Sequence, residues 1–268
     1  MRKEFILLVS LFLLLCESCD LIDYHPYDAK DSGVKDVNAT AIKNIQNLCE
    51  WKEVVRFAWM GDTQRWYDGT DDFVQSVNMR SDIDFVMHGG DISDFGMTQE
   101  FTWVHRIMKK LNVPYVALLG NHDVLGNGIS VYHSMYGAEN FSFIAGDTKF
   151  VCLNTNALEF DYSHPVPDFS FIKKEIEDAN PAVKRTVVAM HTPPFGEQFD
   201  NNVADVFQMY IRKLPGLTFC MHAHTHKLKV QDLFGDGIIY YGCASMKERS
   251  YIVFTLTPLG YEYEVVYF

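Results

Sequence analysis

Short apolar runs with the length of buried strands recur along this chain, and several of them end directly before a polar cluster. The runs that carry such clusters span residues 54–60, 85–87, 115–119, 187–190 and 217–221, and a further run spans 150–153. Continuous apolar runs of this length are typical of strands buried on both faces of a sheet. In open α/β sheets, ligands bind beyond the carboxyl ends of the strands. The pattern therefore predicts an α/β protein with a polar site along one sheet edge.

Helical patterns alternate with most of these runs, which favours mostly parallel strands with helices packed against them. The predicted helices lie near residues 101–111, 168–181 and 203–214, the last with Asn202 as its N-cap and Pro215-Gly216 as its stop signal. Four short runs after residue 229 are separated by glycine and proline turn signals, which predict antiparallel hairpins. The fold class expected is α/β, with a two-sheet β-sandwich flanked by helices.

The N-terminal segment is typical of an export signal. Arg2 and Lys3 precede an apolar run at residues 5–15 that is too short to span a bilayer. Ser18-Cys19 resembles the cleavage and lipidation site of bacterial lipoproteins. We expect residues 1–18 to be a signal peptide, Cys19 to carry the lipid, residues 19–50 to form a tether and lead-in, and residues 51–268 to form one domain. An ordinary secreted protein and an uncleaved anchor are the alternatives. The expected location is the bacterial cell envelope, with the lipid as the only membrane contact.

The charge of the chain limits its substrates. The formal net charge is −12 at pH 7, and no basic patch is visible in the sequence. Long nucleic acid is therefore a poor candidate, because an acidic surface repels polyanions.

Cys49, Cys152, Cys220 and Cys243 would remain after export besides Cys19, and buried free thiols are the favoured interpretation because Cys152 and Cys220 lie in apolar runs. The sequence makes no prediction about oligomeric state.

The residue types at the strand ends suit a metal centre. Carboxylates, imidazoles and an amide oxygen together favour borderline divalent metals such as Mn, Fe or Zn. Two such ions about 3.5–4 Å apart can clamp a phosphoryl group. The glycines before Asp91 and Asn121 would let the backbone approach closely and turn sharply. Each cluster alone has an ordinary interpretation as a turn, a helix cap or a surface loop, but their common position after successive strands indicates one site.

In combination these clusters resemble the motifs of the calcineurin-like metallophosphoesterase superfamily. The matching segments are Gly61-Asp62-Thr63-Gln64, Gly90-Asp91-Ile92-Ser93-Asp94, Gly120-Asn121-His122-Asp123, His191 and Ala223-His224-Thr225-His226. The resemblance implies a four-layer α/β/β/α fold and two divalent metal ions. It places Asp62, Gln64, Asp91 and His226 on one metal, and Asp91, Asn121, His191 and His224 on the other. It also implies that His122 is the catalytic acid and that a metal-bridging hydroxide hydrolyses a small phosphate mono- or diester.

Two positions depart from the family pattern, and they keep a second interpretation open. Gln64 stands where the family usually has histidine, in an Asp-x-Gln variant, and Ala223 replaces a glycine. An amide oxygen is a weaker ligand than imidazole for these metals. The alternative is therefore a catalytically inactive, ligand-binding lipoprotein on the same scaffold. A nuclease would need a basic groove and fits the charge poorly.

Several nearby residues have weaker assignments. Asp94 is interpreted as a cap or as a partner that orients a ligand, and His88 as packed beside the site. His222 is interpreted as a surface residue, with a supporting contact to a ligand as the alternative. Asn154 and Asn156 are interpreted as turn residues. Four residues are placed in loops that could line a pocket, and none is assigned a role: Trp66, Tyr67, Tyr162 and His164.

Overall fold

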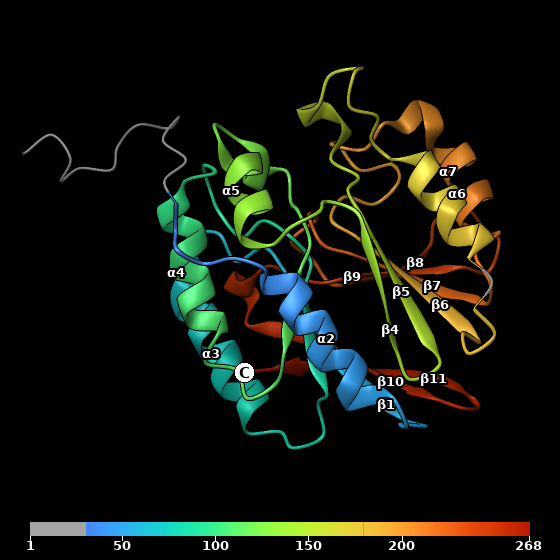
Figure 1. The fold of residues 1–268 in the computed structure, drawn as a ribbon, viewed down its shortest axis with the longest axis horizontal. Helices are drawn as coiled ribbons and strands as arrows, with labels where there is room; N and C mark the ends of the chain where they lie inside the picture. The colour runs from blue at the N-terminus through green and yellow to red at the C-terminus, as the bar shows by residue number, and fades with distance from the viewer. Residues whose placement is uncertain (1–30, 179) are drawn as a thin grey trace, which may run out of the picture.

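The computed structural model describes residues 31–178 and 180–268. The predicted signal peptide and Cys19 lie outside the described residues, as does the first part of the lead-in segment. Within the described residues, strands form two mixed sheets that pack face to face, with helices on both outer faces (Figure 1). The predicted two-sheet sandwich with flanking helices is confirmed.

The first sheet has the strand order β11-β10-β1-β2-β3. Its members are β1 (Val55–Met60), β2 (Phe85–His88), β3 (Tyr115–Ala117), β10 (Ser250–Thr257) and β11 (Gly260–Tyr267). β1, β2 and β3 run parallel to one another, whereas β10 pairs antiparallel with both β1 and β11. The carboxyl ends of the three parallel strands therefore meet at one edge.

The second sheet has the order β4-β5-β6-β7-β9-β8. Its members are β4 (Phe141–Ala145), β5 (Thr148–Leu153), β6 (Arg185–Met190), β7 (Leu217–His222), β8 (Lys229–Asp232) and β9 (Ile239–Gly242). β5, β6, β7 and β9 are parallel, and β4 and β8 pair antiparallel at the two sides. The hairpins predicted near the C-terminus are confirmed as β8–β9 and β10–β11, but they belong to different sheets.

The helices divide into two outer layers. α3 (Tyr67–Asn78), α4 (Thr98–Met108) and α5 (Gly128–Met135) cover the first sheet, and α6 (Phe169–Glu177) and α7 (Ala204–Ile211) cover the second (Figure 1). Single-turn 3-10 helices lie at His122–Val124, Ala157–Glu159, Asn201–Val203 and Met246–Glu248. In the described part of the chain, no helix is long and apolar enough to cross a membrane.

Burial on both faces explains why the strands read as continuous apolar runs. In β1, Phe57 and Trp59 point into the core between the sheets, while Ala58 and Met60 pack against the helices outside. Successive strand residues face opposite sides, so a sandwich between helices requires apolar residues at every position. Phenylalanines from both sheets fill the central layer in stacked and edge-to-face contacts: Phe57, Phe85, Phe150, Phe219 and Phe254. The four described cysteines are buried free thiols, as predicted.

The structure corrects several expectations about elements. α7 begins at Ala204, and the preceding turn is capped by Asp200, which accepts a bond from the Asn202 backbone at 3.1 Å, so Asn202 is not the cap. Tyr67 opens α3 and does not lie in a loop. α3, α5 and β4 had no clear signal in the sequence. Their segments are rich in polar residues or glycine, or, for β4, only partly buried at a sheet edge.

α2 (Val37–Cys49) lies within the expected lead-in and packs against the ends of β3 and β4. Its residues Ala41, Ile45 and Cys49 join the core between the sheets, while Leu48 is exposed. The buried Asn38 binds edge strand β3, donating to the Ala117 carbonyl at 2.9 Å and accepting from the Ala117 nitrogen at 2.8 Å. One side chain thus continues the hydrogen bonding of the edge strand, which would otherwise be left open.

Asn38→Ala is expected to lower the free energy of unfolding by about 1–3 kcal/mol, the cost of one buried unsatisfied group. The Ala117 carbonyl keeps a second donor, the Tyr132 hydroxyl at 2.8 Å, so only the Ala117 N–H loses its partner. Urea denaturation would measure the change. Asn47→Ala, on the exposed side of the same helix, is the matched control and should change stability by less than about 0.5 kcal/mol. Equal effects of the two substitutions would contradict this role of Asn38.

Candidate metal centre

The loops that follow β1, β2 and β3 in the first sheet and β6 and β7 in the second lie together where the two sheets meet. Asp62 and Gln64 follow β1, Asp91 follows β2, and Asn121 follows β3 in the first sheet. His191 follows β6, and His224 and His226 follow β7 in the second sheet. Asn121 of the first sheet contacts both His191 and His224 of the second. The structure therefore places all seven residues expected as metal ligands in one cluster.

The first half of the cluster surrounds Asp62. This carboxylate is fully buried, and His226 Nε2 lies 3.4 Å from its Oδ1 atom. Gln64 is also buried and donates from Nε2 to Asp91 Oδ2 at 3.0 Å. Burial raises the pKa of Asp62 above its usual range, and the neighbouring His226 works in the opposite direction. Asp62, Gln64, Asp91 and His226, which the resemblance assigns to one metal, thus lie together.

The second half of the cluster centres on His191. Its Nδ1 atom donates to the Gly89 carbonyl at 2.7 Å, so Nε2 is the ring atom that faces the site. Nε2 lies 3.0 Å from Asn121 Oδ1 and 3.3 Å from Asp91 Oδ1. His224 Nδ1 lies 2.9 Å from the same Asn121 oxygen. Asp91 therefore contacts groups of both halves, which is the geometry a bridging carboxylate requires.

Asp91 and His191 stabilise each other's charge. Burial alone disfavours both charged forms, but their mutual attraction outweighs it, holding the pKa of Asp91 below and that of His191 above the ordinary values. Asp62, Asp91 and His191 are all buried, and each offers one ligand atom within 4.8 Å of the others. A cation bound here would take the place of the protonated His191 ring as the positive partner of the two carboxylates. His191 would then release its proton.

The residues present fit a divalent metal centre. Both carboxylate oxygens of Asp62 and the amide oxygen Oε1 of Gln64 are buried without a hydrogen-bond partner among the described residues. Buried oxygens without donors are costly, and a bound cation would satisfy them. Oxygen and imidazole donors together match Mn, Fe or Zn better than an all-oxygen or thiolate set would. Gln64 supplies an oxygen where the family usually has an imidazole nitrogen.

His122 lies beside this cluster and is held by its backbone and its ring. Its backbone nitrogen donates to Asp91 Oδ1 at 3.0 Å, and its Nδ1 donates to the Asp94 carbonyl at 2.8 Å. This second bond fixes the ring tautomer, so Nε2 is the atom through which the ring can exchange a proton. The side chain is about one third exposed, at 32%, and so is accessible from solvent.

Two glycines allow the loops after β2 and β3 to approach closely, as the sequence predicts. A Cβ atom on Gly120 would overlap the backbone nitrogen of Asp91. Gly90 has φ +95°, and a Cβ there would lie 2.7 Å from the Gly120 nitrogen. The buried carboxylate of Asp123 joins the same loops, accepting from Ser93 N at 2.7 Å and Gly120 N at 2.9 Å. No role is assigned to Asp123 from the sequence. Its position directly after His122 is the feature that could have indicated one.

The secondary assignments have mixed outcomes. His88 is buried beside the site and bonds Thr63 Oγ1 at 2.9 Å, as expected. His222 is also buried, so its assignment to the surface is wrong; it is the last residue of β7, and its ring packs against Gly242. Asn154 makes a turn bond to the Asn156 nitrogen at 3.0 Å, and Asn156 binds the Leu119 carbonyl at 3.0 Å, bracing the loop after β3. Asp94 holds Arg65 and orients His122, which fits the expected supporting role.

Backbone strain is concentrated at this site. Eight non-glycine residues among those described have a left-handed backbone, with positive φ. Four of them carry candidate metal ligands, at Asp62, Asp91, His224 and His226. Such conformations cost of order 1–3 kcal/mol each and are retained where the surrounding structure requires them. Their clustering here supports a functional role for the strand-end loops.

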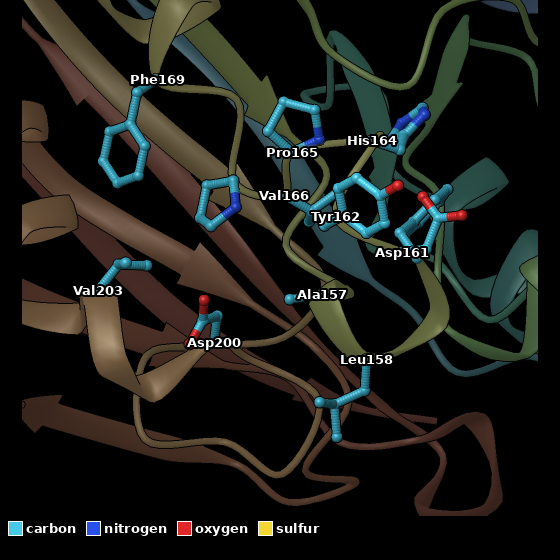
Figure 2. A pocket seen from close by; sticks show the side chains of 12 residues that line it. Ala157, Leu158, Asp161, Tyr162, His164, Pro165, Val166, Phe169, Asp200 and Val203 are labelled. Atoms are coloured by element: carbon cyan, nitrogen blue, oxygen red, sulfur yellow. The ribbon is translucent and has the colours of Figure 1, made fainter.

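A large cavity of about 470 Å³ lies in the loop region after β5, and none of the candidate metal ligands lines it. Figure 2 shows that the rings of Phe169, Pro165 and Tyr162 border it, with Val203 and Leu158 on the other side. His164 fixes this loop to the protein, because its Nε2 forms a hydrogen bond of 3.0 Å with the buried Glu139 carboxylate. Glu139 also accepts from His133 Nε2 at 2.9 Å and from Asn154 Nδ2 at 2.8 Å.

Glu139→Gln is expected to lower the free energy of unfolding at neutral pH by about 1–3 kcal/mol, because hydrogen bonds to a charged group are lost. Burial opposes the charge of Glu139, but the bonds from His133, Asn154 and His164 lower its pKa below the usual 4.5. The stabilisation is therefore present above pH 4.5, the ordinary pKa of the group. It is lost as the pH falls through the lower pKa that Glu139 has in the folded protein. Urea denaturation from pH 3 to 7 should show the difference from wild type shrinking in acid. The exposed Glu197→Gln is the control, and a difference independent of pH would contradict the assignment.

Comparison with known protein families identifies the family of this chain. The sequence matches the calcineurin-like phosphoesterase family over residues 55–228, and the chain belongs to this family. Comparison with curated proteins found no significant match.

Solved structures share the fold at low sequence identity. A dimetal phosphatase from Danio rerio superposes with a TM-score of 0.62 at 12% identity, covering 81% of this chain and 99% of that one. GAP50, the anchor in the inner membrane complex of Plasmodium, gives 0.59 at 13% identity, with 81% and 85% covered. A purple acid phosphatase from yellow lupin gives 0.58 at 15% identity, with 79% and 51% covered. Identities this low show a common fold and leave the reaction to be argued from the site.

Proposed function

We propose that this protein is a dinuclear metal-dependent phosphoesterase that hydrolyses a phosphate mono- or diester. The observation that carries the proposal is the buried cluster in which Asp91 contacts groups of both halves while Asp62 and Gln64 offer oxygens without donors. Two divalent cations bound there would activate water and offset the charge of the phosphoryl group. A substrate that is small and phosphorylated is consistent with the family and with the acidic chain.

The chain's own groups have separable roles in this proposal. Asp62, Gln64, Asp91 and His226 would hold one cation, and Asp91, Asn121, His191 and His224 the other. The Gly89 carbonyl orients His191, and the Asp94 carbonyl orients His122. His122 would donate a proton from Nε2 to the departing alkoxide, which is general acid catalysis.

The test is hydrolysis of p-nitrophenyl phosphate and bis-p-nitrophenyl phosphate by residues 20–268, with and without added Mn²⁺. Elemental analysis of the same sample gives the metal content. Metal-dependent turnover with about two ions per chain is the expected result, and the preferred reagent distinguishes a monoesterase from a diesterase. A folded protein that hydrolyses neither reagent with any metal and holds less than one ion per chain would favour the inactive ligand-binding alternative.

We also propose that the protein is exported to the bacterial cell envelope and anchored there by a lipid on Cys19. The support is the sequence of residues 1–19, which lie outside the described residues. Mass spectrometry of the membrane fraction should find the mature chain beginning at a lipidated Cys19. A Cys19→Ala variant that remains in the membrane fraction with an intact lipid would refute this anchor.

A further inference from the structure

A second cavity, of about 400 Å³, opens beside the candidate metal centre and is lined by an excess of cations. Arg65, Lys247 and Arg249 line it together with one acidic residue, Asp68. Trp66, Tyr67, Gly69 and Met246 complete its wall. We call this the cationic cavity. Three of its eight lining residues are cationic and one is acidic, although the whole chain carries a net charge of −12.

The cationic cavity shares structural elements with the metal centre. Arg65 directly follows Gln64, and its guanidinium forms two bonds of 2.6 Å to Asp94, the residue whose carbonyl orients His122. On the opposite wall, the Met246 nitrogen donates to the Asp62 carbonyl at 3.3 Å. The cavity is therefore anchored to both a candidate ligand and the candidate acid.

The cations of this cavity retain capacity for an anion. Lys247 is exposed, and its Nζ lies 5.6 Å from the centre of the Trp66 ring. Within the described part of the chain, no carboxylate lies within ion-pair distance of Lys247. Arg65 is paired with Asp94 and Arg249 with Asp72, but a guanidinium has five N–H donors and these pairs leave some of them unused.

Lys247 also lines a neighbouring cavity, whose lining includes one candidate metal ligand, His226. That cavity, of about 470 Å³, is lined by His226, Lys227 and Lys247 among others. A group bound by Lys247 would thus lie between the cationic cavity and a candidate metal ligand. Arg65 and Arg249 also share the left-handed backbone of the ligands, with φ 67° and 49°. Their side chains are held by ion pairs to Asp94 and Asp72.

We propose that the cationic cavity binds a second anionic group of the substrate, so that the substrate is a phosphate ester whose remaining part carries a further phosphate or carboxylate. Lys247 would be the principal contact, with Arg65 and Arg249 beside it. The inference rests on the proposed function, since it names the substrate class of that site. A cavity of this size accommodates a small group, so a single anion on a short linker fits better than a polymer.

The test uses a series of straight-chain diols with three to six carbons, each as the monophosphate and as the bisphosphate, and the corresponding phosphorylated hydroxy acids. Phosphate release gives KM and kcat for wild type, Lys247→Met, and Lys43→Met on the exposed side of α2 as the matched control. In wild type, KM should be at least about tenfold lower for the best bisphosphate or phosphorylated acid than for its monophosphate. Lys247→Met should reduce this ratio towards one, whereas Lys43→Met should leave it unchanged.

Calorimetric titration of the same compounds separates this inference from the proposed function, because binding needs no turnover. Selectivity for doubly anionic compounds that depends on Lys247, in the absence of any hydrolysis, would support the anion site and reject the phosphoesterase. Hydrolysis without selectivity in wild type, or selectivity that survives in Lys247→Met, would overturn the inference and leave the phosphoesterase standing. Comparing the bisphosphates with the phosphorylated acids shows which anion the cavity prefers.

Discussion

Replacing Asp91 with alanine is expected to reduce kcat/KM by about 10⁴-fold or more, which corresponds to about 5.5 kcal/mol of transition-state stabilisation. Asp91 has the central position in the cluster, since its carboxylate contacts Gln64, the His122 backbone and His191. Its removal takes away the one carboxylate shared by the two proposed metals and leaves His191 without its charged partner. Steady-state hydrolysis of p-nitrophenyl phosphate with added Mn²⁺ measures the loss.

Elemental analysis and circular dichroism of the same Asp91→Ala sample identify the cause. We expect fewer than two ions per chain in a protein with native secondary structure. Asp91→Asn keeps the shape of the side chain and serves as the test if the alanine variant does not fold. The exposed Asp205→Ala in α7 is the matched control and should retain full activity. An Asp91→Asn variant with wild-type activity and metal content would remove Asp91 from the site.

His122→Ala should lower kcat by about 10²–10⁴-fold for an ester with a poor leaving group, the range usual for general acid catalysis. The loss should be much smaller for p-nitrophenyl phosphate, because p-nitrophenolate departs without needing a proton. Metal content should stay at the wild-type level, since the His122 ring points to the Asp94 carbonyl and belongs to neither group of ligands. Steady-state kinetics with an alkyl phosphate and with p-nitrophenyl phosphate measures the difference.

His122→Asn is a second variant that preserves the backbone bond to Asp91 and most of the side-chain volume. It should show the same dependence on leaving group. Equal losses for both esters would indicate that His122 positions the substrate or the loop and does not supply a proton. Loss of metal in either variant would show instead that His122 supports the ligand cluster.

The sequence predicts the layers of the fold and the candidate ligands because both follow a one-dimensional repeat. Buried parallel strands appear as continuous apolar runs, and the ligands come directly after them, as with Asp62 after β1 and His191 after β6. The segments that form α3 and α5 show no such pattern. α3 includes Gly69 and several acidic residues within its first two turns, and α5 begins at Gly128, so neither has a strong helical signal.

The cationic cavity could not be predicted from the sequence, because tertiary structure assembles it. Arg65 lies after β1, whereas Lys247 and Arg249 lie between β9 and β10, and a bridge between Gly61 and Ser245 brings the two segments together. The sequence shows no local run of basic residues at either place. His222 was misassigned for a related reason: its exposure depends on where β7 ends and on Gly242 in the neighbouring strand.

The division of the ligand cluster between two sheets has a mechanical consequence. Asp62, Gln64, Asp91 and Asn121 follow strands of the first sheet, and His191, His224 and His226 follow strands of the second. The phenylalanine layer between the sheets, with Phe57 and Phe150 in edge-to-face contact at 5.1 Å, therefore acts as the spacer that sets the separation of the two ligand groups. Close packing transmits a change of volume in this layer to the sheets on either side. The packing between the two sheets thus sets the distance between the two groups of candidate ligands.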